Sequence, residues 1–157
     1  KYVPPHLKSR GGGDEKSMAK RRATQRLNGL VNRLSYENID PISRDVKSIY
    51  HDGRGLSRRE VTEALCAILL KSCQESGSTH VLNSLVEPQA ALIAGLHLTG
   101  NTNLGAYVVE NFCIQLERML NEIEPQSKHA LISDKGPHNV ALFIATLYEF
   151  RVVHAGL

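Results

Sequence analysis

Histidine, cysteine and carboxylate side chains are the groups in this sequence that could carry acid–base, nucleophilic or metal chemistry. Neither an H-E-x-x-H motif nor a Cys/His cluster with metal-ligand spacing occurs, and no serine lies in a G-x-S-x-G motif. Glu122 and Glu124 lie beside Pro125, where a solvated acidic loop is favoured over a paired acid–base site. The sequence therefore predicts no catalytic residue, no metal site and no cofactor. The seven histidines are scattered along the chain: His6, His51, His80, His97, His129, His138 and His154.

The cysteines and a run of glycines also give no sign of a catalytic, metal or nucleotide site. Cys66, Cys73 and Cys113 form no C-x-x-C pair, so we expect reduced, buried thiols. The glycines at positions 11–13 lack the frame of a phosphate-binding loop, and a flexible spacer is expected there. His97 stands between two leucines and is expected to be a packing residue with satisfied hydrogen bonds.

Charge is distributed unevenly along the chain. The net charge of the 157 residues is +3, yet residues 1–59 hold 14 Lys and Arg against 6 Asp and Glu, whereas residues 60–157 hold 5 against 10. The first part is thus at +8 and the second at −5. This asymmetry indicates that the front of the chain meets an acidic partner, either nucleic acid or an acidic protein surface.

Hydrophobic periodicity predicts the helices that must position these charges. From about Lys20 to Leu34, apolar residues recur at i, i+3, i+4 and i+7 and form one stripe: Leu27, Leu30, Val31 and Leu34. At about 100° per residue, basic and amide side chains fall on the other side of this helix. They are Arg22, Arg26, Asn28, Asn32 and Arg33. This outward face has three interpretations: a solvated surface, a nucleic-acid surface or a protein-binding surface.

Further helices are predicted behind recognisable caps. Asp40 before Pro41 indicates an N-cap with proline at the first helical position, and Ser57 with Glu60 forms an S-x-x-E capping box. Gly100 is expected to end a helix. The expected core-facing positions include Ile42, Val46 and Ile49; Val61, Leu65, Ile68 and Leu69; Val108, Val109, Phe112, Leu116 and Met119; and Val140, Phe143, Ile144 and Leu147.

The spacing of these helices predicts an all-α fold without strands. They pair as 20–50, 57–98 and 103–150, and a repeat of about 40–47 residues is typical of HEAT-type repeats, which stack into an α-solenoid. Residues 1–19 are expected to be an extended, flexible leader, and residues 20–157 the N-terminal portion of a domain that continues beyond Leu157. No apolar run approaches the roughly 20 residues that span a bilayer.

Several segments resemble one protein family. Residues 1–7, Lys-Tyr-Val-Pro-Pro-His-Leu, resemble the K-Y-[IV]-P-P-x-[LV] leader that precedes a MIF4G domain, the middle-domain fold of translation initiation factor 4G. Residues 27–35 resemble the first helix of that domain, with its G-L-[IVL]-N-[KR]-[LV]-[SN] pattern, and Glu37-Asn38-Ile39 follows as in relatives. Gly105-Ala106 and residues 147–153 are most similar to the nucleolar branch. The spliceosomal branch shares the leader and first helix but less of the rest.

The resemblance implies a function. Such domains are HEAT-repeat scaffolds, without catalytic activity, that clamp DEAD-box RNA helicases of the initiation-factor-4A class. Family contacts fall at positions matching Asn32 and Arg33, and we add Asn28, Arg26 and Arg22 on the same outward face. The nucleolar branch implies a helicase of the type-III subclass, small-subunit ribosomal RNA processing, and a location in the nucleus and nucleolus. The glycine spacer and the segment 121–137 depart from any family pattern.

Two alternatives remain open. The chain could be the MIF4G module of a spliceosomal or messenger-RNA factor that binds the same helicase class. It could instead bind RNA or a pre-ribosomal particle directly through its basic front, at Lys8, Arg10, Lys20 and Arg21. Neither alternative involves a membrane or a small-molecule substrate.

Overall fold

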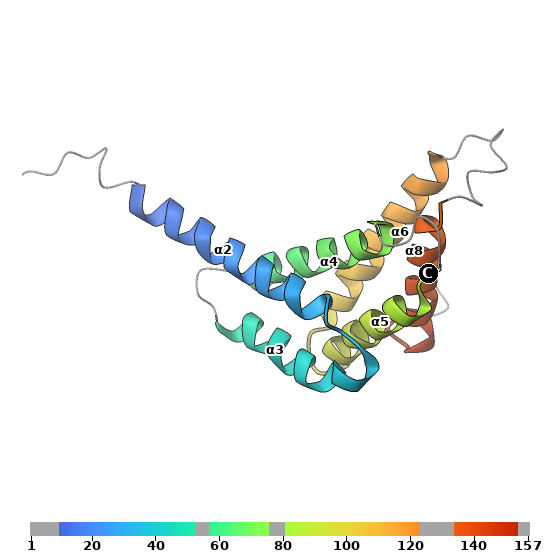
Figure 1. Cartoon of the computed structure of the whole chain (residues 1–157), viewed down its shortest axis with the longest axis horizontal. Helices are drawn as coiled ribbons and strands as arrows, with labels where there is room; N and C mark the ends of the chain where they lie inside the picture. The colour runs from blue at the N-terminus through green and yellow to red at the C-terminus, as the bar shows by residue number, and fades with distance from the viewer. Residues whose placement is uncertain (1–9, 53–56, 76–80, 123–133, 154–157) are drawn as a thin grey trace, which may run out of the picture.

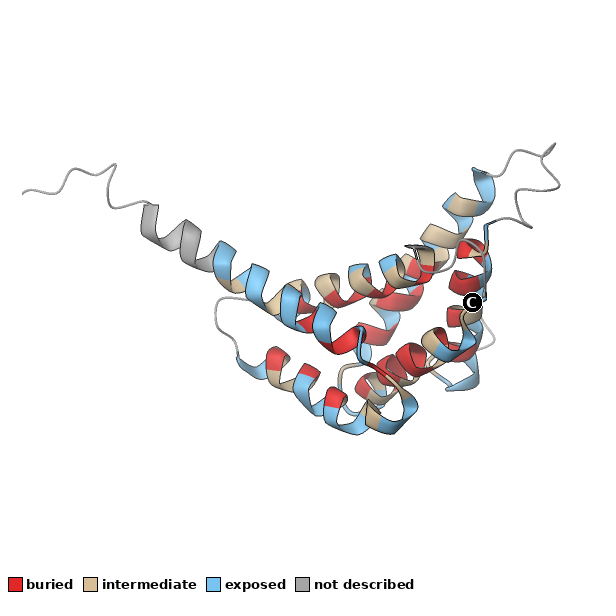
Figure 2. Cartoon of the chain, viewed as in Figure 1, coloured by how far each residue is buried: buried red, intermediate tan, exposed pale blue. Residues whose placement is uncertain are grey.

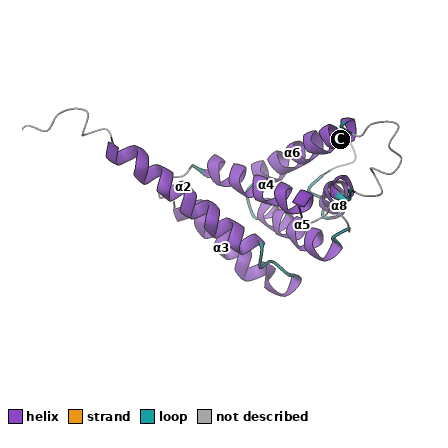
Figure 3. Cartoon of the chain, turned by 45° about the horizontal axis from the view of Figure 1, so that its top comes forward, coloured by secondary structure: helices purple, strands orange, loops and turns teal. Residues whose placement is uncertain are grey.

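The computed structural model describes residues 10–52, 57–75, 81–122 and 134–153, with side chains from residue 17 onward except at residue 75. Every regular element in these ranges is a helix, and no strand occurs among them (Figure 3). The elements are α2 (Arg10–Val31), the 3-10 helix η1 (Tyr36–Asn38), α3 (Ile39–Asp52), α4 (Arg58–Glu75), α5 (Asn83–Leu98), α6 (Thr102–Asn121) and α8 (Gly136–Glu149).

The helices stack in pairs, which confirms the all-α repeat architecture (Figure 1). α2 lies along α4, while α3 runs back beneath them and packs on α5. α8 packs against α4, α5 and α6. The expected pairing within 57–98 is wrong, because α4 packs mainly on α2 and α8 whereas α5 packs mainly on α8 and α6, and α4 and α5 hardly touch each other. α8 contacts both α4 and α5 and so connects these two helices.

The core is continuous from α2 to α8, with buried positions facing inward between the helices (Figure 2). The predicted apolar stripes supply most of it, and Leu27, Val46, Leu65 and Leu69 are fully buried. The rings of Phe112 and Phe143 stack at the centre of the α6–α8 contact, with centroids 4.2 Å apart. Some expected core residues are only partly buried and lie at the margin: Ile68, Leu116, Met119 and Ile144.

The expected leader over 1–19 is wrong for its second half, because α2 begins at Arg10 rather than at Lys20. Each glycine costs a helix roughly 1 kcal/mol relative to alanine. Behind the glycines, however, the segment is rich in Lys, Arg, Met and Ala, which favour helix. A helix that packing has already nucleated further along can propagate through the glycines. Residues 1–9 lie outside the described residues.

The cap predictions were partly correct. The Ser57 box is confirmed, since the Ser57 N–H donates to Glu60 Oε2 (2.9 Å) and the Glu60 N–H donates to Ser57 Oγ (3.3 Å). Asp40 is not an N-cap, because η1 leads directly into α3, which begins at Ile39. Gly100 ends α5 as expected: it has φ +109°, and its N–H donates to the His97 carbonyl while the Asn101 N–H donates to the Leu96 carbonyl.

Arg151 ends α8 with the same hydrogen-bond pattern but without a glycine. Its φ is +60°, its N–H donates to the Tyr148 carbonyl, and the Val152 N–H donates to the Leu147 carbonyl. The turn brings Val152 beside Gly105, where a Cβ would lie 2.9 Å from the Val152 side chain and would overlap His97 Nδ1. Glycine at 105 is therefore required by this close approach. The expectation of satisfied hydrogen bonds for His97 is wrong, because its buried Nδ1 has no partner among the described residues.

A buried asparagine joins three helices near the start of α8. Asn139 is 0% exposed; its Nδ2 donates to the Cys73 carbonyl at the end of α4 (3.3 Å), and its Oδ1 accepts from the Leu82 N–H before α5 (3.0 Å). Nearby, the buried Gln89 of α5 donates to Ser72 Oγ of α4 (2.8 Å). The two bonds of Asn139 pair backbone groups that the helix ends would otherwise leave unpaired.

The three cysteines are free, as expected, and Cys66 and Cys73 are buried whereas Cys113 is half-buried. Burial raises the pKa of both the Cys66 and the Cys73 thiol to about 12. Among the described residues, no group of three or more His, Cys, Asp or Glu side chains is placed to hold a metal ion. None of the described helices is long and apolar enough to cross a membrane.

Candidate functional site

The candidate site is the outer surface of α2, whose inner surface fixes its orientation. Leu27, Leu30 and Val31 are at most 2% exposed and hold the C-terminal half of the helix against α3 and α4. Toward its N-terminus α2 extends beyond the other helices (Figure 1), and its residues 17–22 are mostly exposed (Figure 2). Around the C-terminal half of α2, the side chains outside the core fall into three groups: those at the edge next to α3, those at the edge next to α4, and those that face outward.

Arg26 lies on the edge that faces α3. Its guanidinium donates to Ser48 Oγ (3.3 Å) and lies 4.0 Å from an Asp45 oxygen and 3.9 Å from an Asp52 oxygen. The side chain is about half exposed, so each ion pair stabilises the fold weakly. Arg26 was predicted to contact a partner, but the structure gives it a contact between helices.

Lys20 lies on the opposite edge, toward α4. Its Nζ is 3.8 Å from Glu60 Oε1, and the side chain of Glu60 also completes the capping box of α4. Of the four residues predicted to contact RNA, Lys20 and Arg21 are exposed on α2. Lys8 lies outside the described residues, as does the side chain of Arg10, which is the first residue of α2.

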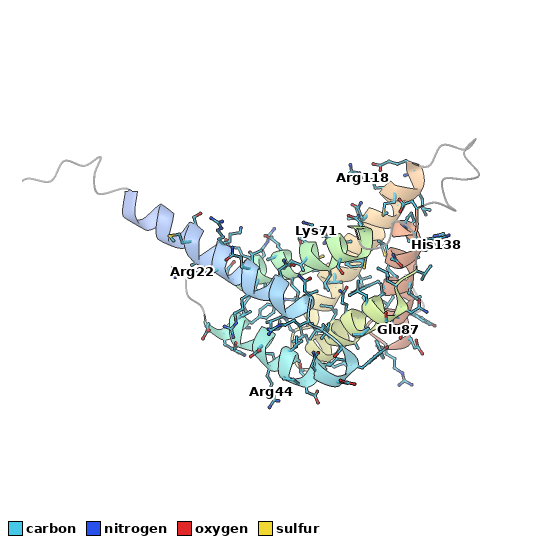
Figure 4. The ribbon with its side chains drawn as sticks, viewed as in Figure 1. Arg22, Arg44, Lys71, Glu87, Arg118 and His138 are labelled. Atoms are coloured by element: carbon cyan, nitrogen blue, oxygen red, sulfur yellow. The ribbon has the colours of Figure 1, made fainter. Side chains whose placement is uncertain are left out.

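The outward face carries the other predicted contact residues. Arg22, Asn28, Asn32 and Arg33 are all exposed, and Arg22 lies on the protruding part of α2 (Figure 4). The Arg33 Nε donates to the Gly29 carbonyl (3.0 Å), which leaves the two terminal nitrogens of the guanidinium at the surface. Four of the five residues predicted to contact the helicase are thus exposed on α2 or in the turn that follows it.

The turn after α2 contains groups that the helical periodicity missed. Asn38 Nδ2 donates to the Arg33 carbonyl (2.7 Å), and Asn38 Oδ1 accepts from the Ser35 N–H (2.8 Å). Tyr36, which is 57% exposed, donates its hydroxyl to Glu87 on α5. The hydrogen bond to the Glu87 carboxylate, with smaller contributions from desolvation and from the charges of Glu87 and Glu149, raises the pKa of Tyr36 to about 12. The family-like segment Glu37-Asn38-Ile39 was the available signal for this turn.

Chemically, the face offers amide and guanidinium groups that donate directed hydrogen bonds, together with positive charge. The stacked helices place the chain in the class of α-solenoid proteins. Such proteins use extended exposed surfaces for binding.

Sequence similarity to known proteins indicates the family more specifically than the fold does. It is 31% identical over 153 residues to the Suppressor of glycerol defect protein 1 of Schizosaccharomyces pombe, a match that covers 98% of this chain and 19% of that protein. It is 27% identical to the human Nucleolar MIF4G domain-containing protein 1 (99% of this chain, 17% of that protein). It is 24% identical to the Drosophila melanogaster homolog of the latter (100% and 18%). No protein-family model and no solved structure matches the chain.

The chain is homologous over nearly its whole length to the nucleolar MIF4G domain-containing proteins, which confirms the resemblance. It spans about a fifth of the length of these curated relatives.

Proposed function

We propose that this chain is a non-catalytic scaffold that binds a DEAD-box RNA helicase of the initiation-factor-4A class, of the type-III subclass, through the outward face of α2. The observation that carries the proposal is the joint exposure of Asn32 and Arg33 in the turn that directly follows α2, a helix whose inner side is fixed in the core. A scaffold of this kind changes helicase activity by its differential affinity for the open and closed states of the enzyme.

The proposed setting is processing of small-subunit ribosomal RNA in the nucleolus. It is supported by the names of the human and Drosophila relatives, which contain the words nucleolar and MIF4G domain. A fluorescent fusion of the natural protein should concentrate in nucleoli, and its depletion should cause precursors of small-subunit ribosomal RNA to accumulate. A uniformly cytoplasmic fusion with unchanged ribosomal RNA would contradict this part of the proposal.

Binding of a purified helicase tests the proposed contact. We expect Arg33→Glu to weaken the affinity by roughly 2 kcal/mol, because it places a negative charge against an acidic contact. The double variant Asn32→Asp/Arg33→Glu should weaken binding further. Arg44→Glu is the matched control, since it makes the same charge change at an exposed residue on α3 (Figure 4). Circular dichroism should show that each variant folds.

Loss of binding in the Arg33 variant but not in the Arg44 variant would support the α2 face as the contact. Equal loss in both would mean that general charge attraction explains the binding. Unchanged affinity in a folded Arg33→Glu variant would exclude this face.

Direct RNA binding is the second candidate, and the exposed basic run Lys20-Arg21-Arg22 on the protruding part of α2 favours it. Affinity for single-stranded RNA should then fall steeply between about 50 and 200 mM salt. Replacing Arg21 and Arg22 by glutamine should remove about two phosphate contacts. The slope of the logarithm of the binding constant against the logarithm of salt concentration should become correspondingly shallower. RNA binding that is absent or insensitive to salt would exclude this function.

We also propose that residues 20–157 are the N-terminal portion of a longer MIF4G domain. The support is the outer surface of α8, where Ala141, Ala145 and Tyr148 are exposed and Glu149 is the sole charged residue of the helix. An uncharged helix surface of this kind usually packs against another element. In the natural protein, the amides of α8 should therefore exchange hydrogen more slowly than in this chain alone. Hydrogen exchange that is equally fast in both proteins would contradict this.

A further inference from the structure

The turn that joins α2 to α3 carries the end of the proposed contact. Asn32 and Arg33 are exposed at its start, while Leu34 is 8% exposed and inserts into the core directly behind them. The burial of Leu34 fixes one point of the turn. It does not by itself fix the peptide orientations on either side, so the direction of Arg33 depends on the bonds made by the following residues.

The carboxamide of Asn38 makes two of these hydrogen bonds, one as donor and one as acceptor. Its NH₂ group donates to the carbonyl of Arg33 (2.7 Å), which lies in the turn two residues beyond the end of α2. Its oxygen accepts from the Ser35 N–H (2.8 Å). Asparagine suits this position because one short side chain supplies a donor and an acceptor together. Aspartate could accept from Ser35, but its carboxylate would face the Arg33 carbonyl without a proton to donate.

A second anchor ties the same turn to the neighbouring repeat. Tyr36 lies between Ser35 and Asn38 and donates its hydroxyl to Glu87 of α5. The backbone from Arg33 to Asn38 is therefore held at two points: the Asn38 side chain closes the turn onto the Arg33 carbonyl, and Tyr36 ties the turn to α5. Holding a contact loop in its bound conformation strengthens binding by lowering the entropy lost on association.

We propose that Asn38 is a positioning residue, which holds the turn so that Arg33 presents its guanidinium in the conformation that the partner binds. This inference rests on the proposed function and adds to it a residue that need not touch the partner. Asn38→Ala and Asn38→Asp should each weaken helicase binding about fivefold, which corresponds to the usual net effect of one hydrogen bond.

A double-mutant cycle separates positioning from a structural role. With Arg33→Ala already present, Asn38→Ala should cause little further loss of affinity, because the group that it positions is gone. Asn111→Ala is the matched control: Asn111 Nδ2 also donates to a backbone carbonyl, that of Tyr107 on α6, at 2.8 Å. It should leave helicase binding unchanged.

Hydrogen exchange of the free chain gives a readout that needs no partner. The Ser35 amide should exchange at least about tenfold faster in Asn38→Ala, while core amides of α4 and α5 keep their rates. Equal loss of affinity with and without Arg33, no loss of affinity, or an unchanged Ser35 amide would each overturn the proposal. If the wild-type chain fails to bind the helicase, the proposed function fails and the role of Asn38 in that contact fails with it. The exchange result would then show separately whether Asn38 holds the turn.

Discussion

The junction of α4, α5 and α8 and the outward face of α2 use similar side chains for different purposes. At the junction, the carboxamide of Asn139 is fully buried and bonds two backbone groups from elements distant in sequence. Asn28 on α2 and Asn32 directly after it are exposed, and their carboxamides can exchange water for a partner. The difference shows that burial determines the role of a polar group. Substitutions at the junction should lower stability, and substitutions on the face should lower affinity.

The largest effect is expected beside the junction, at the aromatic stack between α6 and α8. Phe143→Ala should lower the free energy of unfolding by about 4 kcal/mol, because it removes a fully buried ring stacked on Phe112 and leaves a cavity. Urea denaturation followed by circular dichroism measures the loss. A loss below about 1 kcal/mol would show that this centre is not packed as described.

Asn139→Ala should have the next largest effect. We expect a loss of about 2–3 kcal/mol in unfolding free energy, because the Leu82 N–H and the Cys73 carbonyl would both lose their partner in the interior. Asn111→Ala, which removes a less buried bond on α6, should cost under about 1 kcal/mol. Similar losses in the two variants would contradict a larger stabilising role for the fully buried carboxamide.

Arg151→Gly should act in the opposite direction. Arg151 has φ +60° at the end of α8, a conformation that glycine adopts without strain. The substitution should raise the free energy of unfolding by about 0.5–1 kcal/mol. Thermal and urea denaturation can detect such a gain, and a destabilised variant would contradict the interpretation of Arg151 as a strained cap.

Arg26→Ala tests the boundary between edge and face on α2. Its ion pairs with α3 are long and half exposed, so we expect it to cost under about 1 kcal/mol of stability. Helicase affinity should change less than about twofold, since the side chain is directed toward α3 rather than outward. A loss of affinity as large as that of Arg33→Glu would extend the contact surface to this edge.

Tyr36→Phe should have the smallest effect at neutral pH, because the residue is mostly exposed. The folded-state pKa of about 12 exceeds the usual value of 10, so folding favours the protonated phenol. The stabilisation is complete below pH 10 and is lost as the pH rises toward 12. The difference in stability between wild type and variant should therefore shrink over that interval, and a constant difference would contradict the bond to Glu87.

Periodicity predicted the buried residues well because burial follows from which side of a helix a residue occupies. Leu27, Val46 and Phe143 are buried as expected. The same rule located the outward face, yet it could not separate Arg26 from Arg33, since that distinction depends on carboxylates supplied by α3. Nor could it find Asn38, whose bonds arise from the path of a turn. The cap at Arg151 lacks the glycine that usually marks such a position. The start of α2 was not predicted, because glycines such as those at positions 11–13 disfavour a helix.

The burial of two of the three thiols has a practical consequence. With pKa values of about 12, Cys66 and Cys73 remain protonated at neutral pH, and they are poor nucleophiles toward maleimides or iodoacetamides. Cys113, half-buried on α6, is left as the thiol that such reagents reach first. Cys113 thus offers an attachment point for a fluorophore on a different helix from the α2 face, so that the proposed helicase binding could be measured without substituting any residue of that face.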